Sequence, residues 1–236
     1  MVISHKHRFV FFSNPKTGSE SIRLLLQDFQ EEQVRTFRER SHVHDFYSHM
    51  RPVEARTAFR KRDLDFDDYY RFVFIRNPWA RLVSLYEMIR QNKHADIERK
   101  VPWPERLANL RNGSGDPLFK RWLKTVSEGE AGGGGHDEDR WRKYGTYSLQ
   151  NFVNDEHGKR LVNEVVPLER MHDRLPGLLA KLDLPLSPAN LPHVNRRTSG
   201  QYAPYYDLHS RALVANRYRN EIEEFDYRFE QDRGQT

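Results

Sequence analysis

The 236-residue chain contains no cysteine, so disulfide bonds and thiolate metal sites are excluded. It also has no apolar run approaching the ~20 residues that a membrane-spanning helix requires. The amino-terminal stretch MVISHKHRFVFFSNP lacks an apolar segment followed by a small-residue cleavage site. These absences lead us to expect a soluble, cytoplasmic protein with no membrane span.

Charge of both signs is abundant. Lysine and arginine number 39 against 34 aspartates and glutamates, which gives a net charge of +5. A mixed surface with a small basic excess favours anionic ligands, but it does not choose between a nucleotide, an acidic glycan and a nucleic acid. A nucleic-acid-binding protein is one alternative. It would show a basic stripe with aromatic platforms, whereas here the charges are interspersed, and we predict no nucleic-acid partner.

The stretch RFVFFSNPKTGSESIRLLL near the amino terminus predicts a strand, a tight turn and a helix. Phe9 to Phe12 suit a buried parallel strand, and Ser13 to Gly18 form a turn marked by proline and glycine. Thr17 and Glu20 fit a capping box, so we expect the helix to begin at Thr17. A strand, loop and helix start in this order gather free N–H groups around an anion, with Lys16 inside the loop.

This stretch has two alternative interpretations. One is an ordinary strand-to-helix connection with a solvated Lys16. The other is a nucleotide or sugar kinase of the P-loop type, but the Walker A motif G-x-x-x-x-G-K-[ST] requires its lysine after the second glycine. Lys16 precedes the only glycine here, and no apolar strand ends in an obvious Walker B aspartate.

A second stretch, YYRFVFIRNPWARLVSLYEM, repeats the strand-to-helix pattern. Phe72 to Ile75 predict a strand, Asn77 an N-cap and Pro78 a first helical residue. Arg76 stands at the carboxyl end of the strand, where open α/β sheets place ligands. In the alternative interpretation, Arg76 has only a structural role as an ion-pair partner.

Arg81 and Ser84 lie one turn apart on the same predicted helix and could face the same crevice. The alternative for Ser84 is that it is a small packing residue.

Together, PKTGSES and IRNPWARLVSLY resemble the motifs of sulfotransferases that use 3′-phosphoadenosine-5′-phosphosulfate (PAPS), and more narrowly those of the carbohydrate-type, or family 2, branch. Residues 191–206, LPHVNRRTSGQYAPYY, are similar to a late element of that family. The resemblance implies an α/β, P-loop-like three-layer fold with a central, mainly parallel sheet flanked by helices. It also implies PAPS as cofactor, the bisphosphate PAP as product and an acceptor hydroxyl, on a carbohydrate or glycan from the branch resemblance alone.

The resemblance assigns roles to residues of both motifs. It implies that Lys16 stabilises charge on the departing 5′-phosphate, since sulfuryl transfer depends on positioning and charge stabilisation much as phosphoryl transfer does. No metal is needed in principle. The residues implied at the 5′ side are Lys16, Thr17, Gly18, Ser19 and Ser21, and those at the 3′-phosphate are Arg76 and Ser84.

The acceptor hydroxyl must lose a proton, so a general base is expected. We favour His49, because FYSHM is similar to a segment before the catalytic histidine of heparan-type sulfotransferases. His42, His44 and Glu54 stay open as alternatives, and His193 is a further option. The close spacing of His42 and His44 also suggests a metal site. No carboxylate motif accompanies them, and we predict no bound metal.

The rest of the chain is less specific. We predict one domain over residues 1–236, with a mobile insertion around 93–146 that includes Gly132 to Gly135 and serves either as an acceptor-binding lid or as a tolerated surface loop. Of the tryptophans in this part, buried packing is favoured over stacking on a sugar for most. The other predicted elements are a strand over Gln33 to Phe37, a helix over Pro52 to Arg62, a helix over Leu149 to Val153, a strand over Val162 to Val166, and helices over Glu169 to Leu182 and Leu208 to Phe225.

Overall fold

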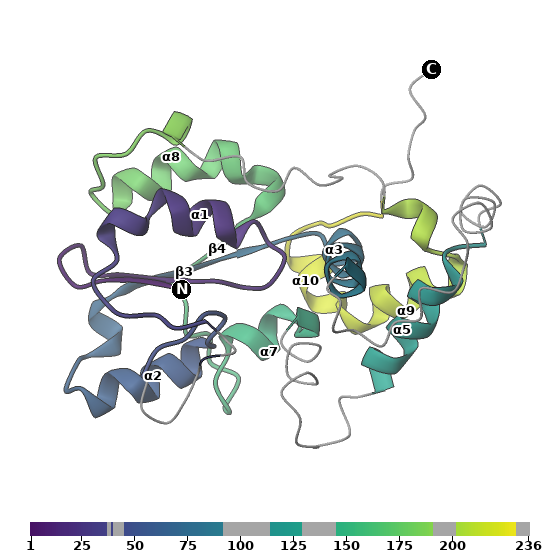
Figure 1. Cartoon of the computed structure of the whole chain (residues 1–236), viewed down its shortest axis with the longest axis horizontal. Helices are drawn as coiled ribbons and strands as arrows, with labels where there is room; N and C mark the ends of the chain where they lie inside the picture. Colours follow the sequence, from purple (N-terminus) through teal and green to yellow (C-terminus); the bar gives the residue numbers. More distant parts are fainter. Residues whose placement is uncertain (37–38, 40–44, 92–113, 129–144, 191–201, 230–236) are drawn as a thin grey trace. The chain divides into compact units, whose positions relative to one another are not determined.

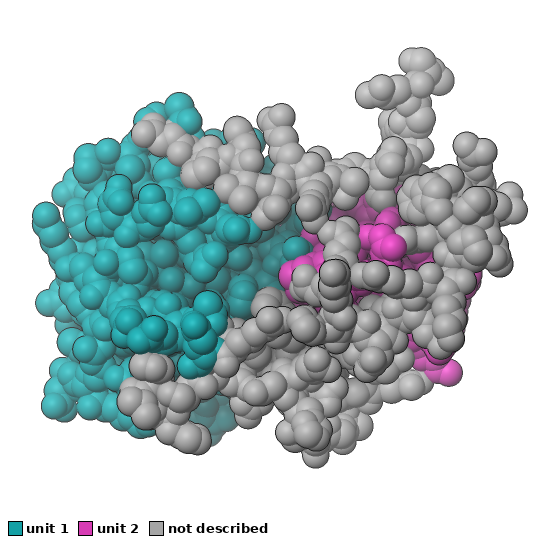
Figure 2. Space-filling model, in the orientation of Figure 1, with its two compact units in different colours: residues 1–76, 149–195 teal, residues 77–148, 196–236 magenta. Residues whose placement is uncertain are grey.

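The computed structural model describes residues 1–36, 39, 45–91, 114–128, 145–190 and 202–229. The chain divides into two compact units, one of residues 1–76 and 149–195 and the other of residues 77–148 and 196–236 (Figure 2). The prediction of one domain over residues 1–236 is not decided by this division.

Unit 1 contains a four-stranded mixed sheet in the order β1-β2-β3-β4. The strands are β1 (Val2–Ser4), β2 (Phe9–Phe12), β3 (Tyr70–Ile75) and β4 (Glu164–Pro167). β2, β3 and β4 run parallel, and β1 pairs antiparallel with β2 at one side. The all-buried run Phe9 to Phe12 is what a strand covered on both faces requires.

Helices cover both faces of this sheet (Figure 1). Because side chains alternate along a strand, Phe9 and Phe11 face α1 (Ser19–Leu25) and α8 (Met171–Lys181) in one apolar cluster. Phe12 lies on the opposite face and contacts Phe66, which itself packs on Phe59 of α2 (Pro52–Lys61). The predicted α/β fold, with a central, mainly parallel sheet flanked by helices, is therefore confirmed.

Short elements complete unit 1. α7 (Leu149–Val153) packs beside α2, and single 3₁₀ turns connect the larger elements. These turns are η1 (Gln27–Phe29), η2 (Phe66–Asp68), η4 (Leu168–Arg170) and η5 (Pro188–Asn190).

The described part of unit 2 is helical and is held by aromatic side chains. Its elements are α3 (Pro78–Gln91), α5 (Pro117–Glu128), η6 (Ala203–Tyr205), α9 (Leu208–Arg217) and α10 (Arg219–Glu224). Tyr86 of α3 packs against Phe119 and Trp122 of α5, and Phe119 also contacts Tyr206. Trp122 is thus a packing residue, as favoured from the sequence.

Several predicted elements need correction. Over residues 33–36 the structure has an isolated bridge between Arg35 and Tyr47 in place of the predicted strand. The fourth strand begins at Glu164 rather than Val162. The last predicted helix is two helices, since the backbone leaves the α conformation at Tyr218 (φ −106°, ψ 24°), whose buried hydroxyl donates to the Thr146 carbonyl at 2.6 Å.

Most of the predicted insertion lies outside the described residues, including Gly132 to Gly135. So do His193 and most of the stretch 191–206. Within the described helices, none is both long and apolar enough to cross a bilayer.

Candidate functional site

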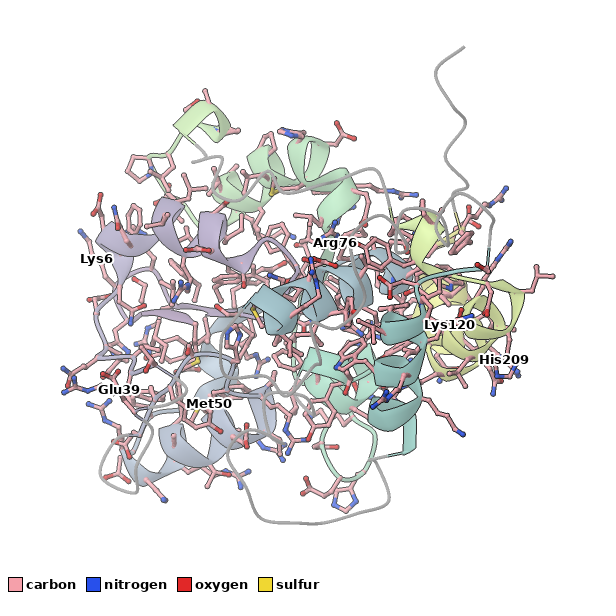
Figure 3. All side chains as sticks on the ribbon, turned by 45° about the vertical axis from the view of Figure 1, so that its right-hand side comes forward. Lys6, Glu39, Met50, Arg76, Lys120 and His209 are labelled. Atoms are coloured by element: carbon pink, nitrogen blue, oxygen red, sulfur yellow. The ribbon has the colours of Figure 1, made fainter. Side chains whose placement is uncertain are left out.

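Three segments leave the same edge of the unit 1 sheet. Phe12 pairs with Val73, and Ile75 pairs with Pro167, so the carboxyl ends of β2, β3 and β4 lie side by side. The loop Ser13–Gly18 follows β2, Arg76 follows β3 (labelled in Figure 3), and η4 follows β4. This edge is where parallel α/β sheets bind ligands. Two stretches that are 60 residues apart in the sequence thus emerge from neighbouring strands.

The loop Ser13–Gly18 is built from unusual backbone conformations. Lys16 and Gly18 both have left-handed φ angles, of 65° and 73°. For a lysine this conformation costs roughly 1–2 kcal/mol, and such strain gathers at functional sites. A side chain at position 18 would also place its Cβ 2.7 Å from Cδ1 of Leu168 in η4. Only glycine satisfies both the φ angle and the close approach.

The start of α1 differs from the predicted capping box. α1 begins at Ser19, its N-cap is Gly18, and no side chain caps it. Thr17 instead donates its hydroxyl to the carbonyl of Asn14 at 2.8 Å, which closes the loop on itself. The prediction of a helix beginning at Thr17 was wrong, because the threonine hydroxyl bonds to a main-chain carbonyl of the preceding loop instead of capping the helix.

The remaining predicted residues of this loop are partly or fully covered. Lys16 is half-buried, and Thr17, Ser19 and Ser21 are buried. The two serines lie on the first turn of α1.

His49 contacts the same loop. Its Nδ1 lies 2.7 Å from the carbonyl oxygen of Ser13. A carbonyl oxygen can only accept, so Nδ1 carries the proton and a neutral imidazole keeps its lone pair on Nε2. The backbone of His49 is also left-handed, with φ at 63°, and the next residue, Met50, is buried (Figure 3).

The protonation state of His49 follows from its surroundings. Burial lowers the pKa of His49 from 6.5 to about 4, and the positive charge of Lys16 acts in the same direction, while the hydrogen bond to Ser13 opposes them. The imidazole is therefore neutral at physiological pH. The structure brings together His49 and the loop of Lys16, two parts that the sequence separates.

The alternative bases are placed differently. Glu54 accepts the main-chain N–H of Arg51 at 2.8 Å and so caps the first turn of α2. His42 and His44 lie outside the described residues.

The second motif forms a self-contained helix start. Asn77 accepts the main-chain N–H groups of Trp79 and Ala80 at 3.1 and 3.4 Å, and Pro78 is the first residue of α3. The N-cap and first helical residue predicted from the sequence are confirmed.

Arg81 serves the interior of unit 2. Only 1% of it is exposed, and its guanidinium donates to the Tyr147 carbonyl at 2.8 Å and pairs with Glu221 at 3.5 Å. The guanidinium also stacks over the Tyr218 ring, 5.1 Å from its centroid. The prediction that Arg81 faces a ligand crevice is therefore replaced by a structural role. Ser84, half-buried on the same helix, keeps its motif-based assignment as a prediction.

One buried residue of the loop was not singled out from the sequence. Asn14 is 1% exposed, and within the described part of the chain neither its side-chain oxygen nor its side-chain nitrogen has a hydrogen-bond partner. Its main chain is engaged, since its N–H donates to Phe12 and its carbonyl accepts from Thr17. No sequence pattern signals an unpaired amide, because burial and pairing depend on the folded surroundings.

A sheet edge that combines a lysine-bearing loop, a neutral histidine and an arginine has the chemistry to hold an anionic ligand. Comparison with known proteins identifies the class. The profile of the Sulfotransferase family matches residues 1–228, so the chain belongs to the sulfotransferase family. This confirms the prediction of a PAPS-dependent sulfotransferase, an enzyme that transfers a sulfuryl group.

The other comparisons are distant or empty. The structure of mouse sulfotransferase SULT7A1 complexed with PAP aligns over 95% of this chain and 87% of that chain, with a TM-score of 0.45 and 10% sequence identity. A search of curated protein sequences found no match.

Proposed function

We propose that the protein moves a sulfuryl group from PAPS to a hydroxyl of a carbohydrate or glycan at the carboxyl edge of the unit 1 sheet. The observation that carries the proposal is the convergence there of the Lys16 loop, His49 and Arg76. The family supplies the reaction class, and the sheet edge supplies residues of suitable chemistry.

The loop fits the 5′-phosphosulfate end of the donor. Lys16 brings a positive charge, Gly18 permits a close approach of backbone, and Ser19 and Ser21 bring hydroxyl groups. The Thr17 hydroxyl already donates a hydrogen bond to the main-chain carbonyl of Asn14. A donating contact from Thr17 to the ligand would therefore come from its main-chain N–H. Preorganised donors of this kind suit an anion whose charge grows on the leaving oxygen.

Arg76 suits the 3′-phosphate, because a guanidinium binds phosphate oxygens in a bidentate manner. It follows β3 directly, one strand away from the loop. Ser84 is assigned to the same phosphate from the motif alone.

His49 is the general base of the proposal. It accepts the proton of the acceptor hydroxyl on Nε2 while Nδ1–H stays bonded to Ser13. The new bond forms between the acceptor oxygen and sulfur, and the bond between sulfur and the oxygen of the 5′-phosphate breaks in line. Lys16 stabilises the charge on that departing oxygen.

Two parts of the proposal, the carbohydrate nature of the acceptor and a cytoplasmic location, are inferred from the sequence alone. The carbohydrate acceptor follows from the branch resemblance, and a panel of hydroxyl acceptors with labelled PAPS tests it.

Binding of PAP tests the proposal most directly. Because a ligand that binds only the folded state stabilises it by mass action, PAP should raise the melting temperature. ATP with Mg²⁺ should raise it much less, and single-stranded DNA only at low salt. Absence of any shift with PAP would contradict the proposal.

Replacement of Lys16 by alanine separates chemistry from binding. Removing one preorganised donor from a developing charge typically slows turnover by about 10²–10³-fold. We expect kcat to fall in that range while the Kd for PAP changes far less. Unchanged turnover would remove Lys16 from the mechanism.

A further inference from the structure

The buried side chain of Asn14 is unusual for a folded protein. Its exposed fraction is 1%, and its amide oxygen and nitrogen both lack a hydrogen-bond partner among the residues that the structure describes. The great majority of buried side-chain polar atoms are paired, so each exception requires a physical reason.

The ligand-free fold gains nothing from this amide. Burying an unpaired polar group is unfavourable, whereas an apolar side chain of the same shape would be neutral or favourable there. Leucine branches at Cγ as asparagine does and has the same number of side-chain heavy atoms, although its methyl groups are larger than the amide's oxygen and nitrogen. An asparagine at position 14 therefore indicates a state in which the amide is paired.

The surroundings of Asn14 indicate the chemistry of that state. It lies in the loop between Ser13, whose carbonyl accepts from His49, and Lys16, whose backbone is left-handed. An amide N–H₂ is a neutral donor, and beside a lysine it suits an anionic oxygen.

We propose that Asn14 is a further ligand-binding residue, whose side-chain N–H₂ donates to an oxygen of the donor's 5′-phosphate group. This inference rests on the proposed function. Both amide atoms are covered in the ligand-free protein, so the contact forms as the loop Ser13–Gly18 shifts on binding. The strained φ of Lys16 lies in the segment that moves.

The substitution Asn14→Leu removes the amide and tests the inference through the affinity for PAP. The Kd for PAP, measured by isothermal titration calorimetry, should increase by about tenfold or more, since a hydrogen bond to a charged group is lost. Asn14→Ala should show the same loss of affinity and guards against misfolding of the leucine variant.

Asn163 provides a matched control in the same unit. Asn163 is exposed rather than buried, and its side-chain oxygen is paired, because it accepts from the main-chain N–H and Nε of Arg71 at 2.8 and 3.1 Å. Asn163→Leu should lower the melting temperature and leave the Kd for PAP unchanged.

Wild-type affinity for PAP in both Asn14 variants would overturn the inference. Failure of the wild-type protein to bind PAP would instead overturn the proposed function, so the two failures are distinguishable.

Discussion

Two of the junctions at which a strand of the sheet is followed by a helix, the β3–α3 junction and the β2–α1 junction, are built differently. Between β3 and α3 only Arg76 and Asn77 intervene, and Asn77 caps the helix with its own side chain. Between β2 and α1 lie the six residues Ser13–Gly18, α1 has no side-chain cap, and the buried amide of Asn14 is unpaired.

The comparison shows how one sheet edge combines stability with binding. The β3–α3 junction satisfies its helix start with Asn77, so Asn77 serves folding, while Arg76 carries the proposed contact to the 3′-phosphate. The β2–α1 junction holds a strained lysine and an unpaired amide, both of which are unfavourable for folding. We therefore expect substitutions in the Ser13–Gly18 loop and at His49 to change chemistry or binding, and substitutions at Asn77 to change stability.

The largest effect should come from His49, which contacts the Ser13–Gly18 loop of the β2–α1 junction. His49→Gln keeps a polar side chain but removes the base, and general-base catalysis typically contributes about 10²–10⁴-fold. We expect kcat to fall in that range with the Kd for PAP nearly unchanged. Full activity would direct attention to His42, His44 or Glu54.

The pH dependence of the same residue sharpens this test. Because the pKa of His49 is about 4 in the folded protein and 6.5 when unfolded, the unfolded state takes up a proton first as the pH falls. Stability is complete above about pH 6.5 and decreases between pH 6.5 and 4. His49→Gln should remove about 1–3 kcal/mol of that acid sensitivity in urea denaturation.

The next effect concerns Arg76. It is proposed to bind the 3′-phosphate, whereas the Ser13–Gly18 loop is proposed to bind the 5′ end of the donor. Arg76→Ala should weaken PAP by about 10–100-fold, as expected for a lost charge-assisted contact, and leave adenosine 5′-monophosphate unaffected. Arg170, at the end of η4 on the same sheet edge, is the matched control. Equal losses for ligands with and without the 3′-phosphate would contradict the assignment.

Glycine substitutions measure the strain of the loop itself. Gly18→Ala meets both a left-handed φ and Leu168 at 2.7 Å, whereas Gly158 has a similar φ of 79° with nothing within 4 Å. We expect Gly158→Ala to cost about 1 kcal/mol of unfolding free energy and Gly18→Ala about 1–3 kcal/mol more. Equal costs would show that Leu168 moves aside freely.

The smallest effect should come from the capped junction. Asn77→Ala leaves two N–H groups of α3 unpaired and should cost about 1 kcal/mol. Both Asn77→Ala and Asn77→Ser lose the amide contact to Arg228, so their difference isolates the cap. The Kd for PAP should not change, and a large change would show that Asn77 itself also contributes to ligand binding.

The sequence was a reliable guide where structure is local. The strand Phe9 to Phe12 and the cap at Asn77 were both predicted, because apolar runs and turn chemistry act over a few residues. The cap of α1 was missed, since Thr17 had two local partners to choose from and spacing does not rank them.

Arginine roles show the same limit. Arg76 and Arg81 belong to one motif, yet Arg81 pairs with Glu221, which lies 140 positions further along the chain. No periodicity near Arg81 reveals that partner.

The sequence by itself determined the parallel strands, the two strand-to-helix junctions and the sulfotransferase family, because each depends on neighbouring residues and on motif order. Only the tertiary structure decided that His49 is neutral and bonded to Ser13, that Leu168 lies against Gly18, and that the Asn14 side chain is buried with no partner among the described residues. Burial and hydrogen-bond pairing are set by groups brought from distant parts of the chain, and so they exist only after folding.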